Sequence, residues 1–114
     1  MNNFIYKIAA KVLLKANINN YTCQYSENMP IPGQVLEDCL FIVSNNGFNK
    51  WLFLKCPCGC GDLLTLSLMK SHSPNWKLRF DWMNRPTLYP SIWKNNGCES
   101  HFWIIKGKLK WEIS

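Results

Sequence analysis

Three of the six cysteines stand at alternate positions in one short stretch, KCPCGCGD, which covers residues 55–62. Three neighbouring thiols cannot all pair with one another, and a packed core has no use for the spacing of Cys56, Cys58 and Cys60. Near the C-terminus the stretch CESH adds Cys98 and His101. Thiolate sulfur and imidazole nitrogen are the ligands that Zn²⁺ takes in tetrahedral sites. The sequence therefore predicts one zinc site made by four of these five side chains, and it leaves open which four.

The purpose of this metal depends on how many positions the protein occupies. A closed site with four protein ligands is structural, whereas catalysis needs an open position and a nearby base. Glu99, next to Cys98, is the candidate general base, and Glu37 and Asp62 are weaker alternatives. Pro57 and the glycines that follow it are expected to bend the backbone into a turn on which the thiolates converge.

Two serines allow a different chemistry. Ser91 follows Pro90 in YPSI, where a Pro-led turn would present it to a substrate or let it cap the turn. Ser100 directly precedes His101 and is expected to orient that loop by a local hydrogen bond. A metal-bound His101 could not act as a base. Serine catalysis is therefore favoured less than zinc chemistry, with Ser91 kept as a candidate catalytic residue.

The elements that position these residues follow from composition and pattern. The chain has 114 residues, 47% of them apolar and 18% charged, which is typical of one globular domain over residues 1–114. Residues 4–16 place apolar side chains on one helical face and Lys7, Lys11 and Lys15 on another, which predicts an N-terminal helix, with a strand as the alternative. The same lysines interrupt any signal peptide. We expect a cytoplasmic protein with reduced cysteines and no membrane span.

Beyond residue 17 the pattern changes to short aromatic and β-branched segments bounded by Pro, Gly, Asn and Ser. These predict a mostly β fold, a small antiparallel sandwich or rolled sheet. The clearest hairpin has its turn at Lys106-Gly107. Cys39 is expected in the core, and Cys23 is left out of any site. The segments are YTCQYS, DCLFIVS, KWLFLKC, DLLTLSL, WKLRFDW, HFWIIK and KLKWEIS.

A resemblance rests on Cys58-Gly59-Cys60-Gly61, Pro90-Ser91-Ile92 and the run from Cys98 to Ile104, with Trp76, Gly107 and Trp111 in the same order. From about Asp38 to the C-terminus, the chain resembles the bacterial family called domain of unknown function 6527. The resemblance implies a zinc-binding β domain. It also implies operons that encode ubiquitin-like, activating-enzyme-like and conjugating-enzyme-like proteins, which would be the partners.

Three functions are weighed on this basis, and the operon context that the resemblance implies slightly favours the first over the second. The first is a zinc-dependent peptidase that processes or removes a ubiquitin-like protein, with Glu99 handling protons. Thiolate-rich zinc is a poor Lewis acid, however, and the sequence has no His-Glu-x-x-His motif. The second is a non-catalytic adaptor with a structural zinc. The third is nucleic-acid binding, which the net charge of +6 permits, although the cations are scattered along the chain and argue mildly against it.

Overall fold

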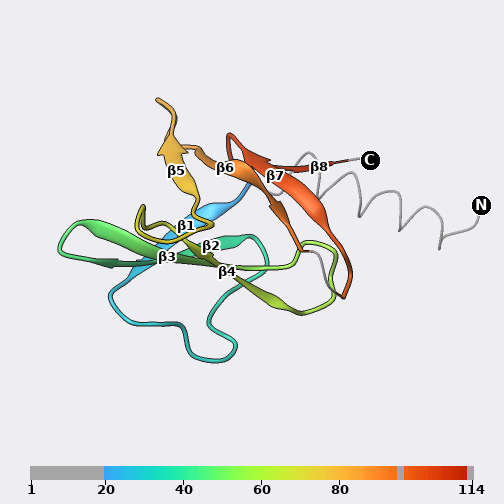
Figure 1. Cartoon of the computed structure of the whole chain (residues 1–114), viewed down its shortest axis with the longest axis horizontal. Coiled ribbons are helices and arrows are strands. Elements are labelled where there is room, and N and C mark those ends of the chain that lie inside the picture. Colours follow the sequence, from blue (N-terminus) through green and yellow to red (C-terminus); the bar gives the residue numbers. More distant parts are fainter. Residues whose placement is uncertain (1–19, 95–96, 113–114) are drawn as a thin grey trace, which may run out of the picture.

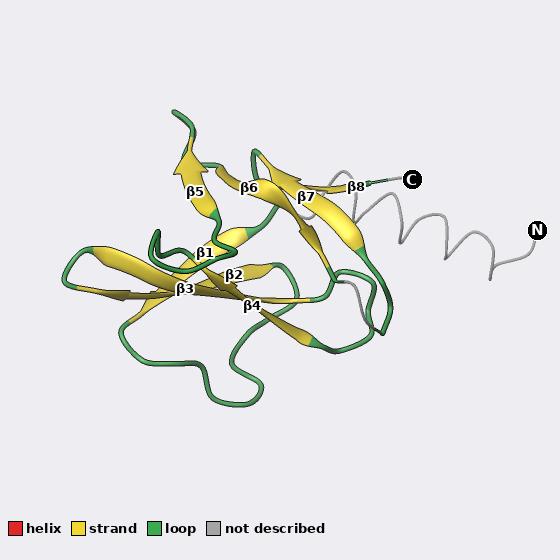
Figure 2. Ribbon diagram, in the orientation of Figure 1, coloured by secondary structure: helices red, strands yellow, loops and turns green. Residues whose placement is uncertain are grey.

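The computed structural model describes residues 20–94 and 97–112, so the helix expected over residues 4–16 lies outside the described residues. The described residues form eight strands in two four-stranded sheets and contain no helix (Figures 1 and 2). The predicted mostly β fold is confirmed. The first sheet has the order β1 (Thr22–Ser26), β2 (Cys39–Asn45), β3 (Phe48–Lys55), β4 (Leu63–Ser67), and the second has the order β5 (Lys77–Phe80), β6 (Pro86–Trp93), β7 (His101–Ile105), β8 (Lys108–Trp111).

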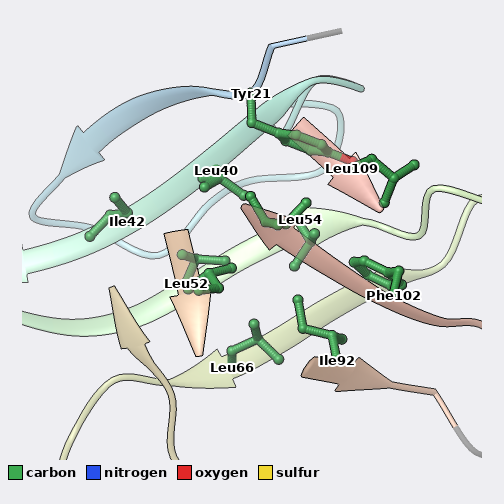
Figure 3. Close-up of a cluster of buried hydrophobic side chains, with 11 residues drawn as sticks. Tyr21, Leu40, Ile42, Leu52, Leu54, Leu66, Ile92, Phe102 and Leu109 are labelled. Carbon is green, nitrogen blue, oxygen red and sulfur yellow. The ribbon is translucent and has the colours of Figure 1, made fainter. Parts of the chain in front are cut away.

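The two sheets face each other across one hydrophobic core (Figure 3). Each sheet contributes the apolar half of its alternating pattern, because successive side chains of a strand point to opposite faces. Each fully buried aliphatic or aromatic side chain contributes roughly 1.5–3 kcal/mol by leaving water. The core residues are Tyr21, Leu40, Ile42, Leu52, Leu54, Leu66, Leu88, Ile92, Phe102, Ile104 and Leu109.

The first sheet is covered on its other face as well. Phe41, Val43 and Phe53 point away from the shared core and pack with Cys39 and with Val35, which comes from the loop before β2. A strand buried on both faces reads as a continuous apolar run, which explains LFIV in β2. The burial of Cys39 predicted from the sequence is confirmed.

Two details of the sheets differ from the sequence prediction. β1 runs parallel to β2, while the other neighbouring strands are antiparallel. The prediction of a turn at YPSI was wrong, because Pro90 and Ser91 lie within strand β6. The β7–β8 hairpin forms as predicted, with Ile105 paired to Lys108 around the two-residue turn. None of the described residues forms a helix that could cross a membrane.

Candidate functional site

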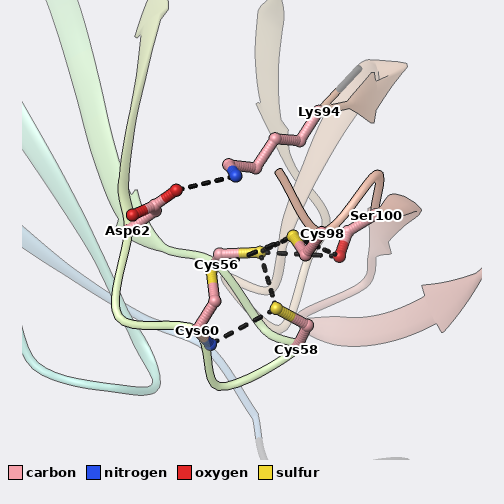
Figure 4. Close-up of polar contacts among 7 residues, drawn as sticks. All are labelled: Cys56, Cys58, Cys60, Asp62, Lys94, Cys98 and Ser100. Carbon is pink, nitrogen blue, oxygen red and sulfur yellow. Dashed lines mark hydrogen bonds and ion pairs between the residues drawn. The ribbon is translucent and has the colours of Figure 1, made fainter. Parts of the chain in front are cut away.

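Four cysteines come together where the two sheets meet at one end of the sandwich (Figure 4). The sulfur of Cys56 lies 3.4 Å from those of Cys58 and Cys98, and the sulfurs of Cys60 and Cys98 are 3.9 Å apart. All four ligand atoms lie within 4.8 Å of one another. Four thiolates around one Zn²⁺, each with a Zn–S distance of about 2.3 Å, would be about 3.8 Å apart. The donor set therefore fits a tetrahedral metal ion of the soft or borderline kind.

The turn after β3 brings three of these sulfurs together. Cys56 directly follows the strand, and its carbonyl accepts a hydrogen bond from the amide of Gly59. Gly59 and Gly61 have φ values of 89° and 87°, a left-handed conformation that favours glycine. The amide of Cys60 donates to the sulfur of Cys58 at 3.3 Å, which stabilises negative charge on that thiolate.

The fourth sulfur arrives on the loop before β7 together with Ser100. The Ser100 side chain is buried, and its hydroxyl lies 3.1 Å from the sulfur of Cys98 and 3.5 Å from that of Cys56. Hydrogen bonding to Ser100 lowers the pKa of the Cys98 thiol, whereas burial raises the pKa of Cys56. The predicted role of Ser100 in orienting this loop thus takes the form of contacts with two sulfurs.

An ion pair joins the two loops beside the sulfurs. The ammonium of Lys94, which follows β6, lies 2.7 Å from a carboxylate oxygen of Asp62 (Figure 4). The hydrogen bond to Asp62 raises the pKa of Lys94. The amide of Lys94 also donates to the carbonyl of Ser100 at 2.7 Å. The segment that carries Cys98 is therefore fixed to both sheets.

His101 does not join this cysteine cluster. Its Nε2 lies 2.8 Å from the hydroxyl oxygen of Ser91, which is hydrogen-bonding distance. The ring of Trp93 stacks on the imidazole with 5.0 Å between centroids and 11° between planes. Ser91 and Trp93 come from β6, and His101 is the first residue of the neighbouring strand β7. The structure thus brings Ser91 and His101 together and leaves the four cysteines as a separate group.

A bulge in β6 presents Ser91. Between the pairs Leu88–Ile104 and Ile92–Phe102, β6 contains three residues and β7 contains one. Pro90 lies in this interval, where its missing N–H breaks no ladder hydrogen bond. Bulges redirect side chains and are frequent beside active sites. The indole N–H of Trp76 donates to the carbonyl of Ser91 at 3.3 Å and so fixes the bulged backbone.

A hollow of about 540 Å³ lies beside His101. Its lining includes two members of the cysteine cluster together with His101 and Trp93, and Glu99, also part of the lining, is exposed. Of the two weaker base candidates, Asp62 pairs with Lys94 and Glu37 lies in the loop before β2. The lining residues are Cys58, Trp93, Cys98, Glu99, Ser100, His101, Trp111 and Glu112.

The matching family is described as "Bacterial ubiquitination-like system serine protease (BubE)", and its model matches residues 25–112. The chain belongs to this family. The match confirms the association with bacterial ubiquitination-like systems that the resemblance implied. No curated protein and no solved structure matches the chain.

The pairing of Ser91 with His101 was not predicted from the sequence, although the alternation of the strands carries a signal for it. Phe102 and Ile104 are buried, so His101 lies on the opposite face of β7. Ile92 is buried, so Ser91 and Trp93 lie on that same face of β6. Two neighbouring strands therefore present a serine and a histidine to the same side.

Proposed function

We propose that this chain is a serine protease in which Ser91 is the nucleophile and His101 is the general base. The observation that carries the proposal is the 2.8 Å separation between Ser91 Oγ and His101 Nε2, with a hollow of about 540 Å³ lined in part by His101. A hydroxyl within hydrogen-bonding distance of an imidazole is the pairing that activates serine for attack on a carbonyl. The description of the matching family supports the same chemistry.

In this mechanism the hydroxyl of Ser91 attacks the scissile carbonyl carbon while its proton passes to Nε2 of His101. His101 then gives that proton to the leaving amine, so the amide bond breaks and an ester to Ser91 remains. Water, deprotonated by the same imidazole, hydrolyses the ester and restores the enzyme. The stacked ring of Trp93 holds the imidazole plane in place during both proton transfers.

The four cysteines supply a metal site, for which we propose Zn²⁺. Cys56, Cys58, Cys60 and Cys98 would hold it with sulfur in all four tetrahedral positions, and a closed site of this kind adds folding free energy. This favours serine chemistry over the zinc-activated water expected from the sequence. The metal's part is to fix the loop that ends at His101.

The substrate we propose is a ubiquitin-like protein, either as a precursor or conjugated to a target. Membership of a ubiquitination-like family supports this substrate, and it makes activating-enzyme-like and conjugating-enzyme-like proteins the expected partners. We also propose that this family is the same as the domain of unknown function 6527, which the sequence resembles. Glu99 takes no proton in this mechanism and lies where the substrate would enter.

The test is cleavage of the ubiquitin-like protein of the same system, fused through its C-terminus to a reporter domain. We expect the full chain to release the reporter and Ser91→Ala to release none. Ser71→Ala is the matched control, because Ser71 is exposed in the loop between β4 and β5. No cleavage by the zinc-loaded protein, with the modifier still bound, would favour the adaptor function in place of the protease.

A further inference from the structure

The outer face of the second sheet, which points away from the shared core, carries the Ser91–His101 pair and continues beyond it along the strands. Two residues from Ser91 lies Tyr89, and two residues from His101 lies Trp103; their ring centroids are 6.2 Å apart. Tyr89 is 60% exposed. Two residues of a strand span about 7 Å, so along β7 the Tyr89–Trp103 pair begins one such step from His101.

Cations flank the Tyr89–Trp103 pair on both sides. Lys77 of β5 is paired with Tyr89, and Lys110 of β8 is paired with Trp103, so one row across the sheet reads cation, aromatic, aromatic, cation. The next row places Arg79 and Lys108 at its two ends. All four cations are exposed. Among the described residues, two carboxylates lie next to these rows: Glu112, which accepts a hydrogen bond from the indole of Trp103, and Asp81, which pairs with Arg85.

We propose that this cationic platform, made by Lys77, Arg79, Tyr89, Trp103, Lys108 and Lys110, docks an acidic face of the protein substrate whose chain is cut at Ser91. The inference rests on the proposed function and names the partner chemistry that the same site would select. Exposed cations on the two edge strands, β5 and β8, form one field across the sheet, which raises the encounter rate with an acidic protein. An extended chain spans about 3.5 Å per residue, so a short tail bridges the platform and the nucleophile.

Charge also argues against two other occupants. A second copy of this chain would bring the same four cations against themselves. Residues 1–19 contain Lys7, Lys11 and Lys15 and no acidic residue, so they do not complement the platform either. Aromatic and cationic residues together could bind single-stranded nucleic acid. The continuity of the platform with a proteolytic pair favours a protein.

The experiment measures binding without chemistry. The full chain with Ser91→Ala is titrated against the fluorescently labelled ubiquitin-like protein of the same system, and anisotropy is followed at low and high salt. We expect Lys77→Glu with Lys110→Glu to weaken binding about tenfold or more and to flatten its salt dependence. Lys50→Glu, an exposed lysine on β3 of the other sheet, is the matched control and should change binding less than about twofold.

In the chain with Ser91 intact, the same double reversal should raise KM for the protein substrate and leave turnover of p-nitrophenyl acetate unchanged. Unaltered binding in the double variant would overturn the platform, as would the absence of any binding. Tighter binding of a 20-nucleotide single strand that competes with the protein, or dimers that the double variant abolishes, would also overturn it. If the double reversal weakens binding but the unaltered chain cleaves nothing, the docking platform is supported and the protease function is refuted. If the chain cleaves the substrate and the double reversal leaves binding unchanged, the protease function is supported and the docking platform is refuted.

Discussion

The cysteine cluster and the Ser91–His101 pair lie next to each other in the chain and in space, yet their surroundings are opposite. In the cluster each sulfur contacts another sulfur, and buried Ser100 closes one side. The pair lies on the open face of a sheet, where Trp93, 66% exposed, is its neighbour. Within the four residues of CESH, Cys98 and Ser100 turn to the cluster while His101 turns to the open face. The comparison teaches that one short loop can join a cluster of four cysteines to a histidine on the open face of a sheet.

A change of His101 tests most sharply whether the Ser91–His101 pair and the cysteine cluster are separate groups. His101→Asn should reduce cleavage about 10³-fold or more, because no base remains for the Ser91 proton. Zinc content and the thermal midpoint of unfolding should stay those of the unaltered chain, since the imidazole lies outside the cluster. Metal analysis by mass spectrometry and calorimetry check this. Loss of zinc together with activity would place His101 among the ligands and remove the distinction between the two groups.

Changing the cluster should give the opposite pattern. Cys98→Ser, or a strong chelator, should lower zinc content and remove both fold stability and activity. A loss of about 3 kcal/mol in the free energy of unfolding would lower the midpoint by roughly 12–24 °C for a domain of this size. Cys23→Ser is the matched control, because Cys23 lies on β1 outside the cluster. Full activity with the metal removed would show that the cluster does not anchor the pair.

Ser100 tests the coupling itself and should have the smallest effect. Ser100→Ala removes the hydroxyl that contacts Cys98 and Cys56, at a cost of about 1 kcal/mol and therefore roughly 4–8 °C in the midpoint. We expect zinc to remain bound and cleavage to fall several-fold through kcat, because the loop before His101 loosens. Cleavage at the unaltered rate, measured beside an unfolding curve that does shift, would confine Ser100 to stability.

The parts of this account that sequence predicts are those set by local pattern. Alternation of Leu109 and Trp111 with lysines, next to Lys106-Gly107, predicts the β7–β8 hairpin, and the cysteine spacing predicts a metal site. Strand β6 escapes prediction because Pro90 is typical of a turn, and only the bulge against β7 accommodates it.

The partner of His101 escapes prediction for a related reason. Cys98 and His101 are three residues apart, and the sequence alone does not show whether both face the same way. In the structure Glu99 between them has a φ of 53°, and this left-handed residue separates their directions. Tertiary contacts at Ser91 then decide which group the imidazole meets.

The most direct test of the central claim is labelling by a fluorophosphonate, a reagent that phosphonylates serines activated by a neighbouring base and releases fluoride. Peptide mass spectrometry after brief exposure of the zinc-loaded chain should find the adduct on Ser91, and His101→Asn should abolish it. The account predicts no adduct on exposed Ser71 under the same conditions. An unlabelled Ser91 in a chain that still cleaves its substrate would contradict the account and return catalysis to the metal.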